Sequence, residues 1–361
     1  MRLQTFFGIW PLKLGYCHDK LPLETLPAPA LDCTNGDRFP GVDIEVAKED
    51  QWSGSDDGDE DLAQLSAEQL VQRLTQCGYK AGLVHPADTL VINGFDRDLL
   101  TTVALHVLGE DPHELGEAAQ LLQRTIGAAK TILAVPAPAA ETAGLVPGVD
   151  VCVLPSQYPN GHPEVLARTV AGKLRTKGSM VILPAEQLLA MARSLKTRRP
   201  MTEKLVTFVG RDEKPAKLLK VRVGTPVSKV LEFMNIELQP GERLILGGPL
   251  AGEATYDPAF PITESTDSVM LQAPDKTANI SDSQCIHCGK CVEVCPNKLP
   301  VNLLGRYAEY GIFDKCAELE VERCIECGLC AYVCTARRPM VQFMQFAKSE
   351  LAQTAQNESE D

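Results

Sequence analysis

The chain has 361 residues and a formal net charge of −13. This length allows two or three domains with cores of their own, and 44% hydrophobic with 23% charged residues is typical of soluble globular proteins. The acidic balance argues against a nucleic-acid-binding protein, because affinity for nucleic acids depends on Lys and Arg side chains that neutralise phosphates.

The sequence also argues against a membrane-spanning chain. No apolar run approaches the roughly 18–20 residues that a membrane helix needs. The apolar core of the first residues, FFGIW, is too short for a signal peptide and is followed by Pro11. We therefore expect a chain that neither spans a membrane nor is exported, and that would work at a membrane only by docking on membrane subunits.

Residues 1–64 are expected to form an irregular N-terminal segment that ends in an acidic linker. The linker, QWSGSDDGDEDLAQ, carries five acids, which raises the alternative of a calcium-binding loop. Placing Gly58 at the glycine of an EF-hand would require an acid at position 53, where the chain has Ser53. A solvated linker is therefore preferred.

Residues 65–200 are predicted to form an α/β domain. Ser66 and Gln69 have the spacing of a capping box at the start of a helix. Apolar runs that alternate with amphipathic helical patterns indicate a parallel sheet. The four expected strands are 88–94, 130–136, 150–155 and 179–184, and the helices between and after them are expected near 111–128, 163–174 and 185–195.

In residues 201–274 the alternation of strands and helices gives way to short strands with few helical segments, which predicts a small α+β domain of the β-grasp type. Short strands are expected in KLVTFVG, LLKVRVG, ERLILGG and SVMLQA, with a single helix in PVSKVLEFMN. A polar linker leads to residues 275–350, which are expected to be helical, with helices at 301–311 and 313–320. The tail 351–361 is acidic and expected to be disordered.

Nine of the thirteen cysteines lie between Cys285 and Cys334, which favours metal ligation over disulfides in a chain without an export signal. Eight of them form two runs of the pattern C-x2-C-x2-C-x3-C. The first run is Cys285, Cys288, Cys291 and Cys295, and the second is Cys324, Cys327, Cys330 and Cys334.

This spacing predicts two [4Fe-4S] clusters with crossed ligands. Three cysteines spaced three residues apart can wrap around one cluster, while the fourth ligates the other cluster. The expected ligands of the first cluster are Cys285, Cys288, Cys291 and Cys334. Those of the second are Cys324, Cys327, Cys330 and Cys295.

Zinc is the alternative metal, but it needs only four ligands, usually from paired C-x2-C units. Eight cysteines in doubled ferredoxin spacing favour iron–sulfur clusters. His287 lies inside the first run and is interpreted as an exposed neighbour rather than a ligand. Cys77, Cys152 and Cys316 lie outside the pattern and are interpreted as small core residues.

The complete layout resembles the RnfC/RsxC family, a component of the Rnf electron transport complex. The resemblance covers most of the chain and rests on segments spread along it: GIWPLKLGYCHDKLPLETLPAP, DTLVINGFDRD, VLPSQYPNGH, VRVGTPVSKVLE, LILGGPLAG and CIHCGKCVEVCP…CIECGLCAYVCT. It implies an α/β domain like the flavoprotein of respiratory complex I, a ligand-binding β-grasp (SLBB-type) domain and a helical dicluster ferredoxin domain.

The resemblance also implies a site for FMN and NADH, built from a glycine-rich loop and an acidic turn. Only Gly78 and Gly82 stand where that loop is expected, and Asp96 and Asp98 replace the two glutamates of the turn. The barrel-like N-terminal segment is also short. These departures argue against NADH oxidation and flavin binding by this chain. For Asp96 and Asp98 we prefer the alternative that they complement a helix N-terminus.

The leading hypothesis is a peripheral electron-transfer subunit of an Rnf-type complex, on the cytoplasmic face of the inner membrane. The implied partners are other membrane and iron–sulfur subunits of that complex, with a ferredoxin or a cytochrome as a further donor. The acidic net charge would favour a basic partner.

Two alternatives from other classes stay open. One is a soluble flavin- or NADH-dependent iron–sulfur reductase related to cobalamin reductases. The other is a regulatory or scaffold protein that carries a cluster, which two fully ligated clusters and the acidic charge disfavour.

Overall fold

The computed structural model describes residues 23–25, 62–175, 178–211, 216–276, 280–281 and 283–360. They fall into two compact units. The larger unit holds the described residues up to Gly248 together with Glu253–Gln272, and the smaller unit holds Pro249–Gly252 and the described residues from Ala273 onward. The acidic stretch 51–61, for which the sequence predicts a linker and leaves a calcium-binding loop as the alternative, lies outside the described residues.

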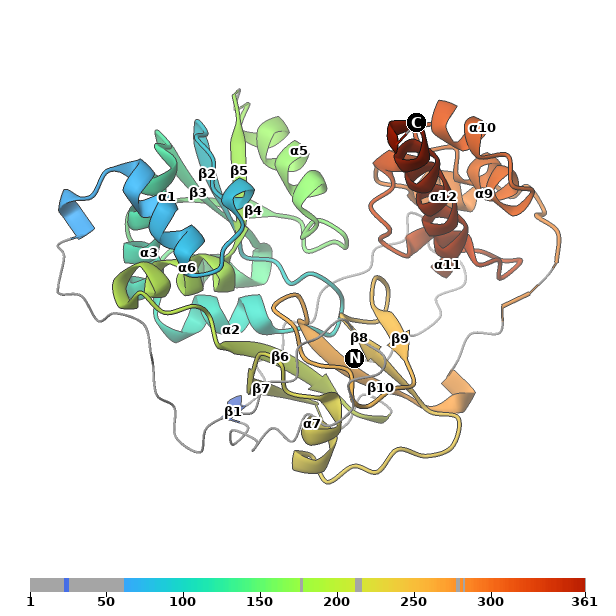
Figure 1. Ribbon diagram of the computed structural model, residues 1–361, viewed down its shortest axis with the longest axis horizontal. Helices are drawn as coiled ribbons and strands as arrows, with labels where there is room; N and C mark the ends of the chain where they lie inside the picture. The colour runs from blue at the N-terminus through green and yellow to red at the C-terminus, as the bar shows by residue number, and fades with distance from the viewer. Residues whose placement is uncertain are drawn as a thin grey trace. The chain divides into compact units, whose positions relative to one another are not determined.

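A four-stranded parallel sheet forms the centre of residues 65–200, as the apolar runs predict (Figure 1). Its order is β4-β3-β2-β5, so the chain passes from the middle of the sheet to one edge and returns to the other. The strands are β2 (Thr89–Asn93), β3 (Lys130–Pro136), β4 (Asp150–Leu154) and β5 (Met180–Pro184).

Helices cover both faces of this sheet. The face with α1, α3 and α6 carries the main core, in which Leu70, Leu115 and Leu188 are fully buried. The helix α5 lies against β2 and β5 on the other face (Figure 1). The helices are α1 (Ala67–Gln76), α2 (Val103–Glu110), α3 (Pro112–Ile126), α4 (Ala140–Ala143), α5 (Pro163–Leu174) and α6 (Ala185–Thr197).

The predicted capping box is present at the start of α1. The Gln69 N–H donates to Ser66 Oγ at 3.3 Å, and the Ser66 N–H donates to Gln69 Oε1 at 2.8 Å. Helix α2 is not predicted from the sequence. Thr102 at its N-cap gives no side-chain hydrogen bond, so the usual local signal of a helix start is missing there.

A mixed six-stranded sheet of order β1-β7-β6-β10-β8-β9 is formed by five strands between residues 203 and 272 together with β1 from the N-terminal segment, and α7 (Val227–Phe233) packs on its core. The four strands and the helix expected in this region are found. Two three-residue strands at its edges are not expected, and β1 belongs to the segment predicted to be irregular. The strands are β1 (Leu23–Thr25), β6 (Glu203–Val209), β7 (Ala216–Arg222), β8 (Arg243–Leu246), β9 (Glu253–Thr255) and β10 (Ser268–Gln272).

A buried cation links helix α6 to the second sheet of the larger unit. Lys204 on β6, with 5% of its side chain exposed, pairs with Glu186 on α6 and, at 2.8 Å, with Asp267 before β10. Burial by itself would lower the pKa of Lys204, but the carboxylates of Asp267 and Glu186 outweigh it and raise the pKa. Lys204 therefore stays charged and binds the α/β layer to the second sheet.

The smaller unit is helical, and α12 is its longest element (Figure 1). Helix α9 packs on α12 around fully buried Leu304 and Met344. The predicted helices at 301–311 and 313–320 are confirmed. The helices are α8 (Lys290–Val294), α9 (Val301–Glu309), α10 (Phe313–Glu318), α11 (Leu329–Tyr332) and α12 (Met340–Glu360), with short 3-10 turns at 274–276 and 321–323.

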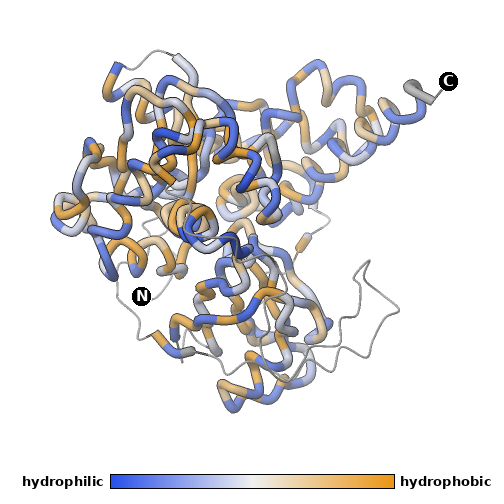
Figure 2. The backbone as a smooth tube through the Cα atoms, turned by 60° about the vertical axis from the view of Figure 1, so that its left-hand side comes forward, coloured by the Kyte–Doolittle hydropathy of each residue, from blue (hydrophilic) through white to orange (hydrophobic). Residues whose placement is uncertain are grey.

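The tail differs from the prediction of disorder, because α12 continues through residues 351–360. These residues contain no Gly or Pro, and Ala, Gln and Glu favour helix. In Figure 2 the tube of this helix alternates between hydrophilic and hydrophobic residues toward the C-terminus. Among the described residues, no helix combines the length and apolar character that crossing a membrane requires.

Replacing Lys204 by methionine is expected to lower the free energy of unfolding by about 3–5 kcal/mol, because two partly buried carboxylates lose their buried partner. Lys220→Met is the matched control on the neighbouring strand, where the pair with Glu203 is about 40% exposed, and should cost no more than about 1 kcal/mol. Urea denaturation followed by circular dichroism measures both. Equal losses for the two variants would contradict the role given to Lys204.

Candidate metal centre

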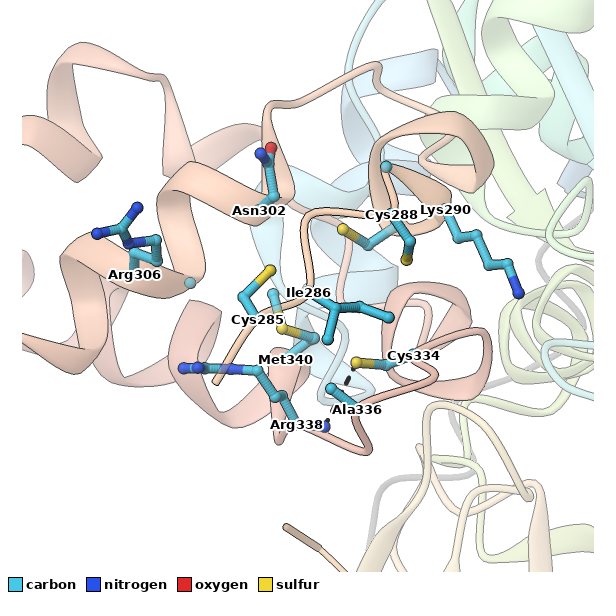
Figure 3. A pocket seen from close by; sticks show the side chains of 13 residues that line it. Cys285, Ile286, Cys288, Lys290, Asn302, Arg306, Cys334, Ala336, Arg338 and Met340 are labelled. Carbon is cyan, nitrogen blue, oxygen red and sulfur yellow. Dashed lines mark hydrogen bonds between the residues drawn. The ribbon is translucent and has the colours of Figure 1, made fainter. Parts of the chain in front are cut away.

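The eight cysteines of the two runs line two separate cavities of the smaller unit. The first cavity is lined by Cys285, Cys288, Cys291 and Cys334, and the second by Cys295, Cys324, Cys327 and Cys330. Three sulfurs around each cavity thus come from one run and the fourth from the other. In Figure 3 the sulfur atoms of Cys285, Cys288 and Cys334 lie around one space, with Lys290 and Arg306 at its two sides.

The two runs repeat each other in backbone conformation at an offset of 39 residues (324 minus 285). In both runs the residue before the second cysteine has a positive φ, 55° at His287 and 52° at Glu326. Gly289 and Gly328 follow that cysteine with φ of 77° and 78° and begin α8 and α11. Glycine adopts this left-handed backbone without a steric penalty, which permits the tight turn at each loop.

The fourth cysteine of each run accepts the same kind of hydrogen bond. The Leu299 N–H donates to Cys295 Sγ, and the Arg338 N–H donates to Cys334 Sγ, both at 3.4 Å. The donor lies four residues after the cysteine in both cases. A backbone N–H directed at sulfur is one way in which a protein tunes an iron–sulfur cluster.

Burial opposes ionisation of the sulfurs, most strongly around the second cavity. It raises the pKa of Cys327 to about 12, and it also raises the pKa of Cys324 and Cys330, where neighbouring cysteines add to the effect. The pKa of Cys291 is raised for the same reason. Such thiols release their protons only to a strong positive charge, as metal ligands do when they bind.

A lysine from α12 fixes the loop of the second cavity. Lys348 Nζ donates to the carbonyl oxygen of Cys324 at 2.6 Å and to the Glu326 carboxylate at 2.7 Å. Burial alone would raise the pKa of Glu326, but hydrogen bonds from Lys348 and Gln345 outweigh it and lower that pKa. The charged pair therefore holds Glu326 in its left-handed conformation between Cys324 and Cys327.

Two further buried polar side chains hold the runs together. Asn297, just after Cys295, donates from Nδ2 to the carbonyl oxygen of Arg323 at 2.5 Å, which ties the end of the first run to the start of the second. Arg338, with 7% of its side chain exposed, pairs with Glu309 on α9 at 2.5 Å. Sequence reasoning missed Lys348, Asn297 and Arg338, because their partners are set by tertiary packing.

Three cysteines outside the pattern are among the described residues, and they lie where the sequence predicts them. Cys77 is 7%, Cys152 2% and Cys316 0% exposed, and all three are core residues. His287 is exposed and does not line the first cavity, in agreement with its interpretation as a neighbour of the site. Burial raises the pKa of the Cys77, Cys152 and Cys316 thiols, which keeps them protonated.

The acidic turn after β2 lies inside the larger unit. Asp96 Oδ1 accepts the Ala104 N–H at 2.8 Å at the start of α2, the helix N-terminal position that was preferred for it. Asp98 is fully buried, and its Oδ1 accepts the Leu99 N–H at 2.6 Å. A Cβ at Gly248 would lie 2.5 Å from the Asp98 Cβ, so the second sheet closes over this side chain. Inward-facing, covered carboxylates do not fit the binding of a flavin or a nicotinamide.

Burial raises the pKa of Asp96 to about 8, with the Asp267 carboxylate adding to the effect against the hydrogen bond from Ala104. Between its ordinary pKa of 3.8 and about 8, the folded chain holds this proton and the unfolded chain does not. The free energy of unfolding should therefore fall as the pH rises through this window and level off above it.

Asp96→Asn should remove this part of the pH dependence, because the amide keeps the acceptor for Ala104 and has no proton to lose. Asp111→Asn is the matched control, since exposed Asp111 caps α3 through the His113 and Glu114 N–H groups, both at 3.0 Å. Urea denaturation at about pH 5.5 and about pH 8.5 tests the difference. An unchanged slope in Asp96→Asn would contradict a proton held at this site.

Residues 277–335 match the 4Fe-4S dicluster domain family. Among curated proteins, the chain is 29% identical, over 73% of its length, to the subunit designated C of the ion-translocating oxidoreductase complex of Rhodobacter capsulatus, and 26% identical to that of Serratia proteamaculans over 65%. It is also 26% identical, over 63% of its length, to the corresponding subunit of the Na(+)-translocating ferredoxin:NAD(+) oxidoreductase complex of Acetobacterium woodii. The predicted resemblance to the RnfC/RsxC family is confirmed.

The chain covers 54%, 37% and 54% of these three relatives, in the order given. It therefore spans between about a third and about half of their lengths. Among solved structures, a chain of the NAD+-reducing [NiFe]-hydrogenase in the H2-reduced state is similar, with a TM-score of 0.50 and 14% identity over 84% of this chain and 68% of the other. At this identity the similarity concerns the fold alone.

Proposed function

We propose that this chain is an electron-transfer subunit of an ion-translocating oxidoreductase complex of the Rnf type. The observation that carries the proposal is the pair of cavities, each lined by four cysteines, in a region that matches a dicluster domain. The similarity to members of the RnfC/RsxC family indicates the type of complex to which the chain would belong. On this proposal the chain lies at the cytoplasmic face of the membrane as a peripheral subunit, among membrane and iron–sulfur partners.

Each cavity would hold one [4Fe-4S] cluster with crossed ligands. Cys285, Cys288, Cys291 and Cys334 would ligate the first cluster, and Cys324, Cys327, Cys330 and Cys295 the second. When bound, such clusters carry one electron at a time. The residues around them would orient the loops, exclude water and direct N–H groups at sulfur. Because the clusters transfer only electrons, no side chain needs to act as an acid or a base.

The larger unit would support this role without a nucleotide site of its own. Its second sheet and the single helix α7 are the secondary-structure elements expected of a β-grasp domain, and we assign residues 201–274 to such a domain. The chain shares an overall fold with a chain of an NAD+-reducing hydrogenase, but the Asp96 carboxylate accepts an N–H of α2, and Asp98 is buried beside Gly248. The electrons would therefore come from another protein rather than from NADH bound here.

Anaerobic purification with iron analysis and absorption spectroscopy tests this function. We expect about eight irons per chain, no flavin band, and bleaching of the clusters by dithionite but not by NADH. A flavin band with rapid bleaching by NADH would instead favour the soluble reductase. A content of about four irons would favour the regulatory protein that carries one cluster.

Single cysteine-to-serine variants test the crossed ligation. Cys295→Ser should disturb the same cluster as Cys327→Ser, so that their electron paramagnetic resonance spectra after reduction match each other and differ from that of Cys288→Ser. Cys316→Ser is the control and should keep both signals, because Cys316 is a core residue. Uncrossed ligation would make the spectrum of Cys295→Ser match that of Cys288→Ser instead.

A further inference from the structure

The surface around the first cavity differs from that around the second in access. Of the eight cysteines, only Cys288 is exposed, whereas Cys295 of the second cavity is buried. Ile286, next to Cys285, is 62% exposed and lines the first cavity, while Ile325 at the matching position of the second run is only partly exposed. The first cavity therefore has an apolar, accessible rim.

The two cavities also differ in charge. Lys290, Arg306 and Arg338 line the first cavity with no carboxylate among the lining residues. Glu326 is the one charged residue that lines the second. In a chain with a net charge of −13, three cations around one cavity form a local exception to the overall acidity.

Two of these cations are available to a partner. Arg338 is buried and paired with Glu309, but Lys290 and Arg306 are exposed. Within the described residues neither forms an ion pair, and Lys290 Nζ reaches only the Thr335 hydroxyl at 3.4 Å. In Figure 3 their side chains extend outward on opposite sides of Ile286.

Helix α9 extends the apolar part of this surface. Leu303, Arg306 and Tyr310 follow one another at spacings of three and four residues, which places them on one face of the helix. Leu303 is 39% and Tyr310 69% exposed. Single exposed apolar residues are ordinary, but Ile286 lines the same cavity as Lys290 and Arg306, and Leu303 and Tyr310 share a helix face with Arg306.

We propose that this surface, which we call the cationic face (Ile286, Lys290, Leu303, Arg306 and Tyr310), docks an acidic one-electron carrier protein. The carrier would present an apolar spot ringed by carboxylates, so that Ile286 packs at the centre while Lys290 and Arg306 meet the ring. The inference rests on the proposed function and names the partner class of that site. It reverses the expectation of a basic partner, because local charge rather than net charge governs docking at a defined surface.

The test is a binding measurement on the full chain with both clusters loaded. Oxidised flavodoxin is the acidic probe and oxidised cytochrome c the basic one, and surface plasmon resonance gives the Kd. We expect flavodoxin to bind with a Kd that rises with salt. Lys290→Glu and Arg306→Glu should each raise this Kd about tenfold, a size expected of charges at an interface. Ile286→Asp should raise it as well.

Lys315→Glu is the matched control, because it changes the net charge by the same amount from α10 and lines neither cavity. It should leave the Kd unchanged. An equal effect of Lys315→Glu and Lys290→Glu, or salt-sensitive binding of cytochrome c in place of flavodoxin, would overturn the cationic face. Iron content measured first separates this failure from failure of the proposed function, since loaded clusters without flavodoxin binding would refute the docking surface alone.

Discussion

Eight sulfurs held in partly buried loops set the constraint on which the smaller unit depends. Burial raises the pKa of the thiols around the second cavity, so they ionise only against a strong positive charge. The Leu299 and Arg338 N–H groups donate to the sulfurs of Cys295 and Cys334. Binding of a metal at these sulfurs would therefore release their protons.

In the larger unit, the unfavourable desolvation of buried charged groups is offset in two other ways. At Lys204, two carboxylates keep the cation ionised where the sheets join. At Asp96, the carboxyl group takes up a proton instead, and it still accepts the N–H that begins α2. Ion pairing and neutralisation thus operate within one joint, because Asp267 influences both Lys204 and Asp96. Asp96, in the turn that the family resemblance links to a nucleotide site, takes part in this joint.

The sequence predicts the strands and cysteine sets well because their signals are local. Apolar runs bounded by turns mark β2 to β5, and the spacing of the runs brings the cysteines into two sets of four. Helix α2 and strand β1 are not predicted, because the groups that stabilise them lie outside their own local sequence pattern. The N–H of Ala104 in α2 is satisfied by a carboxylate eight residues away, and β1 pairs with β7. The contact of Lys348 with the Cys324 loop likewise exists only once α12 has packed.

The repeat of the two cysteine loops has a consequence for how such a domain can be divided. Each run supplies three of the four cysteines of one cavity and a single cysteine to the other. One half of the repeat can therefore complete a set of four only together with a second half, whether that half follows in the same chain or belongs to another copy. The four cysteines of each cavity thus require a pair of loops, and the chain carries the second loop 39 residues after the first (324 minus 285).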